Sequence, residues 1–191
     1  MNYKQIETPE ELMNYMNENI SYGIFDYTKN KAYYGEDDNF GDLVNTTWKL
    51  SSPAQMQKYG VGHCFDQVEL ERDFFTKNNY NFKTYFIWFK CKRPNNYPTH
   101  TYLIYEDKKT NKWCWFEHSD FVNRGIRRFN SLNDAIKAQA IAHIKHAKSY
   151  RKTKTDSSKI EVFEYRDVKY GINFNDFLDY VLTNGKPINI D

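Results

Sequence analysis

The stretch Tyr59-Gly-Val-Gly-His-Cys-Phe-Asp-Gln67 leads a glycine-punctuated loop directly into a strongly patterned helix. The 3.6-residue periodicity predicts that this helix begins at Cys64 and runs to about Lys77. A thiol at a helix N-terminus lies at the positive end of the helix dipole, which favours the thiolate that attacks carbonyl carbon. The stretch therefore indicates a nucleophilic cysteine. The same periodicity places three residues inward and three outward: Cys64, Val68 and Phe75 inward, and Glu69, Arg72 and Asp73 outward.

Three strands are expected after this helix. Residues Phe82–Lys92 are dense in aromatic side chains and are typical of a central strand buried on both faces. His100–Glu106 and Lys112–His118 then alternate as a hairpin across Asp107–Asn111. Helices packed on an antiparallel sheet centred on these strands make the predicted fold class α+β.

The hairpin brings a histidine and an acid together. A loop flanked by Glu106 and Asn111 places His100 opposite Glu117 on one face, about 5 Å apart at Cβ. An odd loop instead places His118 opposite His100 and turns Glu117 away, so Asp120 stays an alternative acid. The Cys64 helix is expected to pack on the face of His100. The order Cys, His, acid favours a nucleophile, its base and a carboxylate that orients the base.

These segments resemble a known family. Gly62-His-Cys64-Phe-Asp66 before an amphipathic helix is similar to the Gly-x-Cys-x-Asp/Glu motif of the transglutaminase-like superfamily of papain-like cysteine proteins. Thr99-His100-Thr101-Tyr102 resembles its His-led strand, and Trp113-Cys-Trp-Phe-Glu117 resembles its strand that ends with the triad acid. The match covers about residues 45 to 130, and the acid is Glu117 where the family usually has Asp.

The resemblance implies a papain-like or transglutaminase-like fold and acyl transfer on a protein or peptide substrate by a triad of Cys64, His100 and Glu117. The thiolate would attack an amide, and water or an amine would resolve the thioester. The unpaired backbone N–H of Cys64 is a natural oxyanion donor. The second donor is expected to be the Trp48 indole, ahead of the Gln55 or Gln57 amide.

Other interpretations of the same residues compete with this one. A lone cysteine in an apolar-striped helix is usually a small buried hydrophobe, and Cys91 and Cys114 lie within strand patterns as inert core thiols. A metal site would draw on several side chains without C-x-x-C or H-E-x-x-H spacing, so neither a metal nor a cofactor is expected. Those side chains are His63, Cys64, Cys91, Cys114, His118, His143 and His146.

The flanks extend one domain of residues 1–191. Thr8-Pro9-Glu10-Glu11 is a strong helix start. A short strand is expected at Tyr22–Tyr27. The C-terminal extension contains a basic helix from Ser131 to about Tyr150, a strand at Ile160–Arg166 and a helix ended by Gly185.

Bulk composition narrows the setting. The N-terminus has no apolar signal region, and no apolar run reaches the roughly 18 residues of a membrane span. Three cysteines, an odd count, argue against a disulfide framework. These features favour a cytoplasmic protein with no membrane partner. The Asn, Lys and Tyr bias suits an AT-rich genome, such as that of a low-GC bacterium or a phage.

Charge gives the alternative function. Residues 122–155 carry nine Lys/Arg against Asp134 alone, a net of +8, which leaves the remainder at −6 because the chain carries +2. A catalytically inactive transglutaminase-like protein using this segment would bind nucleic acid or an acidic protein face. A solvated basic helix is the plainer interpretation. An enzyme needs Cys64 and His100 open to a groove, whereas a binding protein needs only the basic face.

Overall fold

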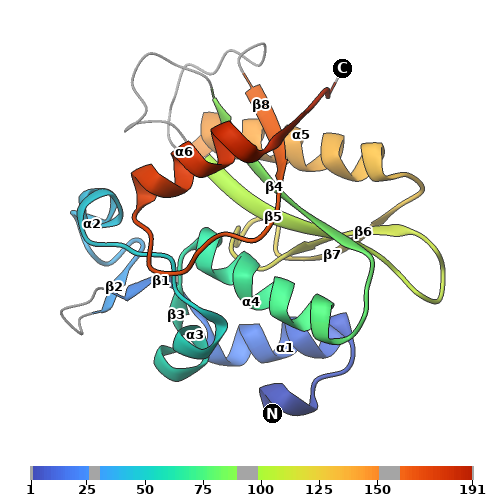
Figure 1. The fold of residues 1–191 in the computed structure, drawn as a ribbon, viewed down its shortest axis with the longest axis horizontal. Helices are drawn as coiled ribbons and strands as arrows, with labels where there is room; N and C mark the ends of the chain where they lie inside the picture. The colour runs from blue at the N-terminus through green and yellow to red at the C-terminus, as the bar shows by residue number, and fades with distance from the viewer. Residues whose placement is uncertain (1, 26–30, 90–98, 151–159, 191) are drawn as a thin grey trace.

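A six-stranded antiparallel sheet carries the architecture, in the order β7-β6-β5-β4-β8-β9 (Figure 1). The computed structural model describes residues 2–25, 31–89, 99–150 and 160–190. The strands of the main sheet are β4 (Phe82–Phe89), β5 (Thr99–Glu106), β6 (Trp113–Glu117), β7 (Gly125–Phe129), β8 (Ile160–Tyr165) and β9 (Lys186–Ile188). Strand β4 is central as predicted, because it pairs with β5 on one side and β8 on the other.

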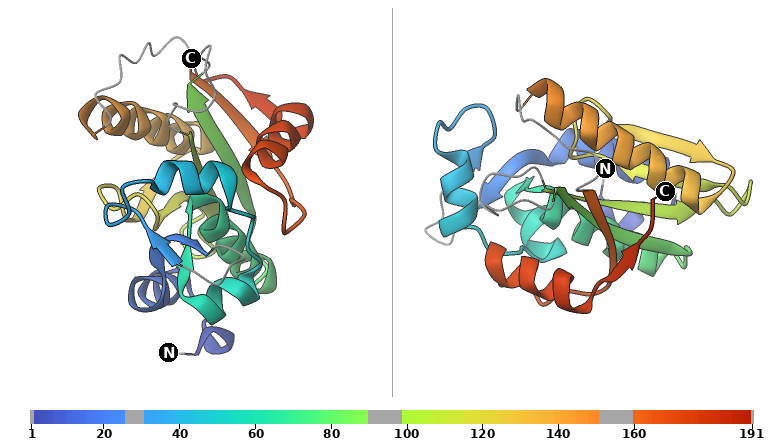
Figure 2. Two further views of the ribbon diagram at one scale, coloured as in Figure 1. Left: turned by 90° about the vertical axis from the view of Figure 1, so that its left-hand side faces the viewer. Right: turned by 90° about the horizontal axis from the view of Figure 1, so that it is seen from above.

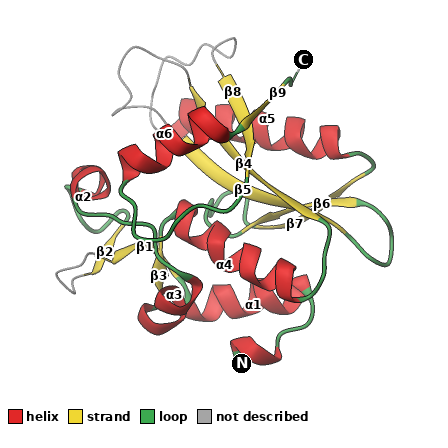
Figure 3. Ribbon diagram, in the orientation of Figure 1, coloured by secondary structure: helices red, strands yellow, loops and turns green. Residues whose placement is uncertain are grey.

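Helices cover both faces of this sheet, which gives an α+β fold (Figure 3). They are α1 (Pro9–Asn19), α2 (Phe40–Thr46), α3 (Pro53–Tyr59), α4 (Cys64–Lys77), α5 (Leu132–Tyr150) and α6 (Phe174–Asn184), after a short 3-10 turn at Tyr3–Gln5. Figure 2 shows α5 on one side of the sheet and α6 on the other. A small second sheet of β1 (Ser21–Phe25), β2 (Lys31–Tyr33) and β3 (Val61–Gly62) lies beside α2 and α3. No helix in the described ranges is long and apolar enough to span a bilayer.

Local sequence signals set most of these boundaries. The Thr8 side chain accepts from Glu11 N while the Glu11 carboxylate accepts from Thr8 N, so α1 begins with a capping box as predicted. Helix α4 runs from Cys64 to Lys77, as its periodicity indicated, and α6 ends before Gly185. Strand β1 covers most of the expected Tyr22–Tyr27 segment, whose last two residues lie outside the described ranges. The end of the expected Phe82–Lys92 strand, residues 90–92 with Cys91, lies outside them too.

The core has a part on each face of the sheet. Phe75 of α4 packs its ring 4.6 Å from Tyr105 and 5.7 Å from Phe116. On the other face, Tyr85 and Tyr102 stack with ring centroids 5.3 Å apart, under the apolar side of α5. Alternate residues of one strand therefore face different helices, as the pleat requires.

The hairpin register differs from the prediction by two residues. Ile104 pairs with Trp115 and Glu106 with Trp113, so the loop spans 107–112. Asp107 causes the longer turn: its Oδ1 accepts from the N–H groups of Lys109 and Thr110, at 2.9 and 2.8 Å. The shift is even, so His100 and Glu117 still share a face.

Two outward assignments on α4 are wrong. Glu69 and Arg72 are buried, and only Asp73 of the three is exposed. Arg72 donates to Glu69 Oε2 at 3.1 Å and to Thr84 Oγ1 at 2.8 Å, with its guanidinium over the Tyr165 ring. Tyr165 of β8, in the C-terminal extension, thus contacts Arg72 on the side of α4 that the helical pattern alone leaves to solvent.

Candidate active site

Glycines shape the approach to Cys64. Gly60 ends α3 in the left-handed conformation, with φ 67°. A Cβ at Gly62 would lie 2.6 Å from Met56 Cε and 3.1 Å from Asp66 Cβ, so a side chain here would force Met56 to move. His63 is then extended and Cys64 is the first residue of α4. The thiol is thereby fixed at the helix N-terminus, where the sequence placed it.

Asp66 fastens this junction from inside the helix. Its Oδ2 accepts hydrogen bonds from His63 N at 2.8 Å and from the Trp48 indole at 2.9 Å, and its Oδ1 accepts from Ser51 N at 2.7 Å. Burial raises the pKa of Asp66 to about 6, against the effect of these three donors. The carboxyl thus ties the loop before α3 to the first turn of α4.

Two of the three side chains considered for the second oxyanion donor, Trp48 and Gln55, have hydrogen-bond partners elsewhere. The single N–H of Trp48 is donated to Asp66, so it is not directed at the thiol. Gln55 caps α3 by accepting from Ser52 N at 2.8 Å. Gln57 is half-buried on α3 and does not line the cavity beside the site, within the part of the chain that the structure describes.

The thiol of Cys64 contacts two imidazoles. Its Sγ lies 3.3 Å from His63 Nδ1, and His100 is close enough to influence its ionisation. Burial opposes ionisation, but the charge on His63 and the interaction with His100 hold the pKa of the Cys64 thiol well below its usual range. His100 thus favours the thiolate of Cys64, while the direct contact of the thiol is with His63.

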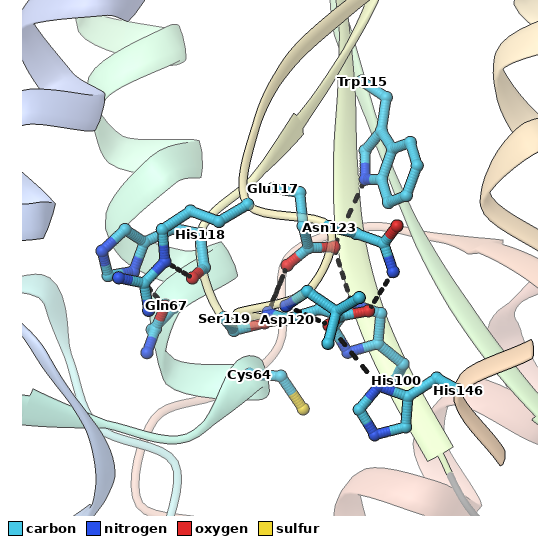
Figure 4. A network of polar contacts seen from close by, with 12 residues as sticks. Cys64, Gln67, His100, Trp115, Glu117, His118, Ser119, Asp120, Asn123 and His146 are labelled. Carbon is cyan, nitrogen blue, oxygen red and sulfur yellow. Dashed lines mark hydrogen bonds and ion pairs between the residues drawn. The ribbon is translucent and has the colours of Figure 1, made fainter. Parts of the chain in front are cut away.

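His100 is in turn held by Glu117, whose Oε2 lies 2.8 Å from His100 Nε2 (Figure 4). Glu117 is saturated by further donors: Ser119 Oγ at 3.0 Å and Asp120 N at 2.8 Å on Oε1, and the Trp115 indole at 3.3 Å on Oε2. Burial disfavours both charged forms, yet the Glu117 carboxylate holds the pKa of His100 well above its usual range. The imidazolium lowers the pKa of Glu117 in return.

Asp120, the alternative acid, has a different place. Its backbone N–H supports Glu117, while its carboxylate accepts from Asn123 Nδ2 at 2.7 Å and lies 3.5 Å from His146 Nδ1. His118, the alternative partner of His100, is turned to the far side of β6. There its Nδ1 lies 2.7 Å from Gln67 Oε1, and burial lowers its pKa to about 4.

The route by which Cys64 reaches His100 differs from the expected one. Helix α4 packs on the face of Tyr105 and Phe116, not on the face of His100. The β5–β6 ladder ends at the Leu103–Phe116 pair, so at His100 strand β5 pairs only with β4 within the described residues. The N-terminus of α4 meets the histidine beyond the end of this ladder, and a shared sheet face is not needed.

A cavity of about 800 Å³ opens beside the imidazoles. His63, His100, His143 and His146 line it, together with aromatic side chains that include Tyr22 and Phe40. Cys64 itself is 1% exposed and is not part of the lining of this cavity. The groove expected for an enzyme is thus present at His100 but does not expose Cys64.

The three further histidines were considered from the sequence only as metal ligands. Within the described ranges no group of three His, Cys, Asp or Glu side chains is arranged to hold a metal ion. His143 instead stacks parallel to His100, with ring centroids 6.0 Å apart. The spacing of His143 and His146 predicts that both lie on one face of a helix. It does not predict which strand that face packs against. His63 carried a plainer signal, its position next to the nucleophile.

Comparison of the sequence with models of known families and with curated proteins gives no match to either.

Proposed function

We propose that the protein is a thiol-dependent acyl-transfer enzyme of the transglutaminase-like, papain-like type, a peptidase, amidase or transglutaminase that acts on a protein or peptide. One observation carries the proposal: Cys64 lies at a helix N-terminus, where its thiol pKa is lowered by two imidazoles, one of them His100, whose Nε2 lies 2.8 Å from Glu117 Oε2. That arrangement is what a nucleophile, a base and an orienting acid require.

The chemistry follows from these contacts. His100 takes the thiol proton, and the imidazolium is stabilised by Glu117. The thiolate attacks the carbonyl carbon of an amide, and the unpaired N–H of Cys64 at the first turn of α4 stabilises the oxyanion. His100 returns the proton to the leaving amine, and water or a second amine then releases the acyl group from sulfur.

An acylation assay tests this proposal. An activated ester such as p-nitrophenyl acetate should give a burst of nitrophenol, with the acetyl group mapped to Cys64 by mass spectrometry. Cys64→Ala should abolish the burst, Cys114→Ala should retain it, and His100→Ala should slow it about 100-fold or more at neutral pH. Peptide amides are then assayed for amine release. A Cys64 that is the slowest thiol to acylate would overturn the nucleophile assignment.

The binding alternative is favoured by one observation, the burial of Cys64 behind the cavity wall. Its basic face is less available than the sequence indicated. Gly125–Phe129 forms strand β7 rather than a free segment. Arg124 Nε donates to His118 O at 2.8 Å, Arg127 lies over Trp115, and Arg128 pairs with Glu10 at 2.9 Å. We therefore rank the enzyme first.

A further inference from the structure

We propose that His63 is a second thiolate-holding residue, which donates a hydrogen bond from Nδ1 to the Cys64 sulfur from a ring that lines the cavity. The inference deepens the acyl-transfer function proposed above and rests on it for its catalytic meaning. It assigns to the residue before the nucleophile a role that the triad does not contain.

This role follows from the contact between His63 and the Cys64 sulfur and from where the single thiol proton goes. The thiol carries one proton, and His100, backed by Glu117, is the group that takes it: the S–H bond breaks and an N–H bond forms on His100. The resulting sulfur anion accepts hydrogen bonds and donates none. His63 Nδ1, 3.3 Å from Sγ, must then carry its own hydrogen and donate it. No bond to His63 changes during this transfer.

The His63 side chain is held in place by its backbone hydrogen bond and by ring packing, not by a carboxylate bound to the imidazole. Its backbone N–H is held by Asp66 Oδ2 at 2.8 Å. The ring packs 5.0 Å from the Phe65 ring and 5.2 Å from the Tyr22 ring, measured between centroids. Because these contacts restrain the side chain before the thiol ionises, the donor needs little reordering to meet the anion.

Other titratable groups that face the thiol supply no positive charge. Glu71, buried on α4, has its pKa raised well above its usual range by burial and by the charge of Glu117. Burial and the charge of Glu69 likewise raise the pKa of Tyr165 on β8. Each raised pKa favours the neutral form and neither group can carry a positive charge, so the stabilising side-chain charge comes from the two imidazoles.

Two variants separate hydrogen bonding from packing. His63→Asn keeps an N–H donor, because its Nδ2 takes nearly the place of imidazole Nδ1, but loses the ring. His63→Phe keeps the ring and loses the donor. The rate of Cys64 alkylation by iodoacetamide is measured across pH by mass-spectrometric mapping, without substrate. Thermal unfolding of each variant checks that it is folded.

We expect His63→Asn to react within about threefold of the parent protein, and His63→Phe to react about tenfold more slowly at neutral pH, its profile displaced to higher pH. Any result in which folded His63→Asn is not faster than folded His63→Phe overturns the inference. Failure of the proposed function looks different: no amide is turned over even by the parent protein, while the two His63 variants still differ in alkylation.

Discussion

His100 Nε2 lies 2.8 Å from Glu117 Oε2, although the two residues lie beyond the last β5–β6 pair and are offset by two positions in its register. If the register of the β5–β6 ladder is continued past its last pair, Leu103 with Phe116, Tyr102 falls level with Glu117 and His100 two residues further along. Diagonal positions are about 7–8 Å apart, against about 5 Å for direct neighbours. The extra methylene of glutamate spans this distance, which gives a physical reason for Glu117 where the resembled family usually has Asp.

Shortening this acid should therefore act like removing it. Glu117→Asp keeps the charge but withdraws it by about 1.5 Å, so the contact with His100 is lost. We expect Cys64 alkylation at neutral pH to fall at least tenfold, close to the loss in Glu117→Ala. Glu117→Gln keeps the length without the charge and serves as the matched comparison. A Glu117→Asp protein that reacts like the parent would show that reach is not the constraint.

The same ion pair should give stability a defined pH window. His100 has a raised pKa, so its contribution is complete below its unfolded value of 6.5 and is lost as pH rises through the folded pKa. Glu117 has a lowered pKa, so its contribution is complete above 4.5 and is lost as pH falls through the folded pKa. The pair therefore contributes fully between about pH 4.5 and 6.5.

This window is measured by urea unfolding across pH in a Cys64→Ser background, because ionisation of the thiol otherwise adds its own dependence. The difference in free energy of unfolding between Glu117 and Glu117→Gln proteins should be largest inside the window and shrink below it. A difference that is constant with pH would mean that the pair is not ionised in the folded protein.

A buried pair on α4 gives a prediction for stability alone. Arg72→Met removes the partner of Glu69, which is 1% exposed, and leaves its carboxylate uncompensated. We expect a loss of about 3–5 kcal/mol in the free energy of unfolding. Adding Glu69→Gln should restore part of that loss, since the buried charge is then gone. Additive losses in this double-mutant cycle, measured by urea unfolding, would contradict the coupling.

This pair also marks the limit of what the sequence predicts. Helix α4, the hairpin and the α+β class follow from local periodicity, caps and turn residues, which act within a few positions of one another. The burial of Glu69 and Arg72 depends on β8, about ninety residues away, and the two-residue hairpin shift depends on the Asp107 turn. The candidate residues Cys64, His100 and Glu117 could be named because their order along the chain is informative. The contact of His63 with the thiol could not be predicted, because being next to Cys64 in the sequence does not fix the direction of the His63 ring.

The last prediction separates catalysis from binding through the basic helix. Lys145 and Lys148 are exposed on α5, the helix that also supplies His143 and His146 to the cavity. Reversing both lysines to Glu changes the charge of the exposed surface, not the contacts of Cys64, His100 or Glu117. Charges beyond about 8–10 Å are largely screened at ordinary salt. Acylation of Cys64 by a small ester should therefore stay within about twofold of the parent.

Binding to nucleic acid or an acidic protein, assayed by fluorescence anisotropy over a salt series, should be weak in the parent and change little on reversal. Salt-sensitive binding in the parent that the reversal removes, in a protein whose Cys64→Ala variant has no phenotype, would assign the function to the basic face instead.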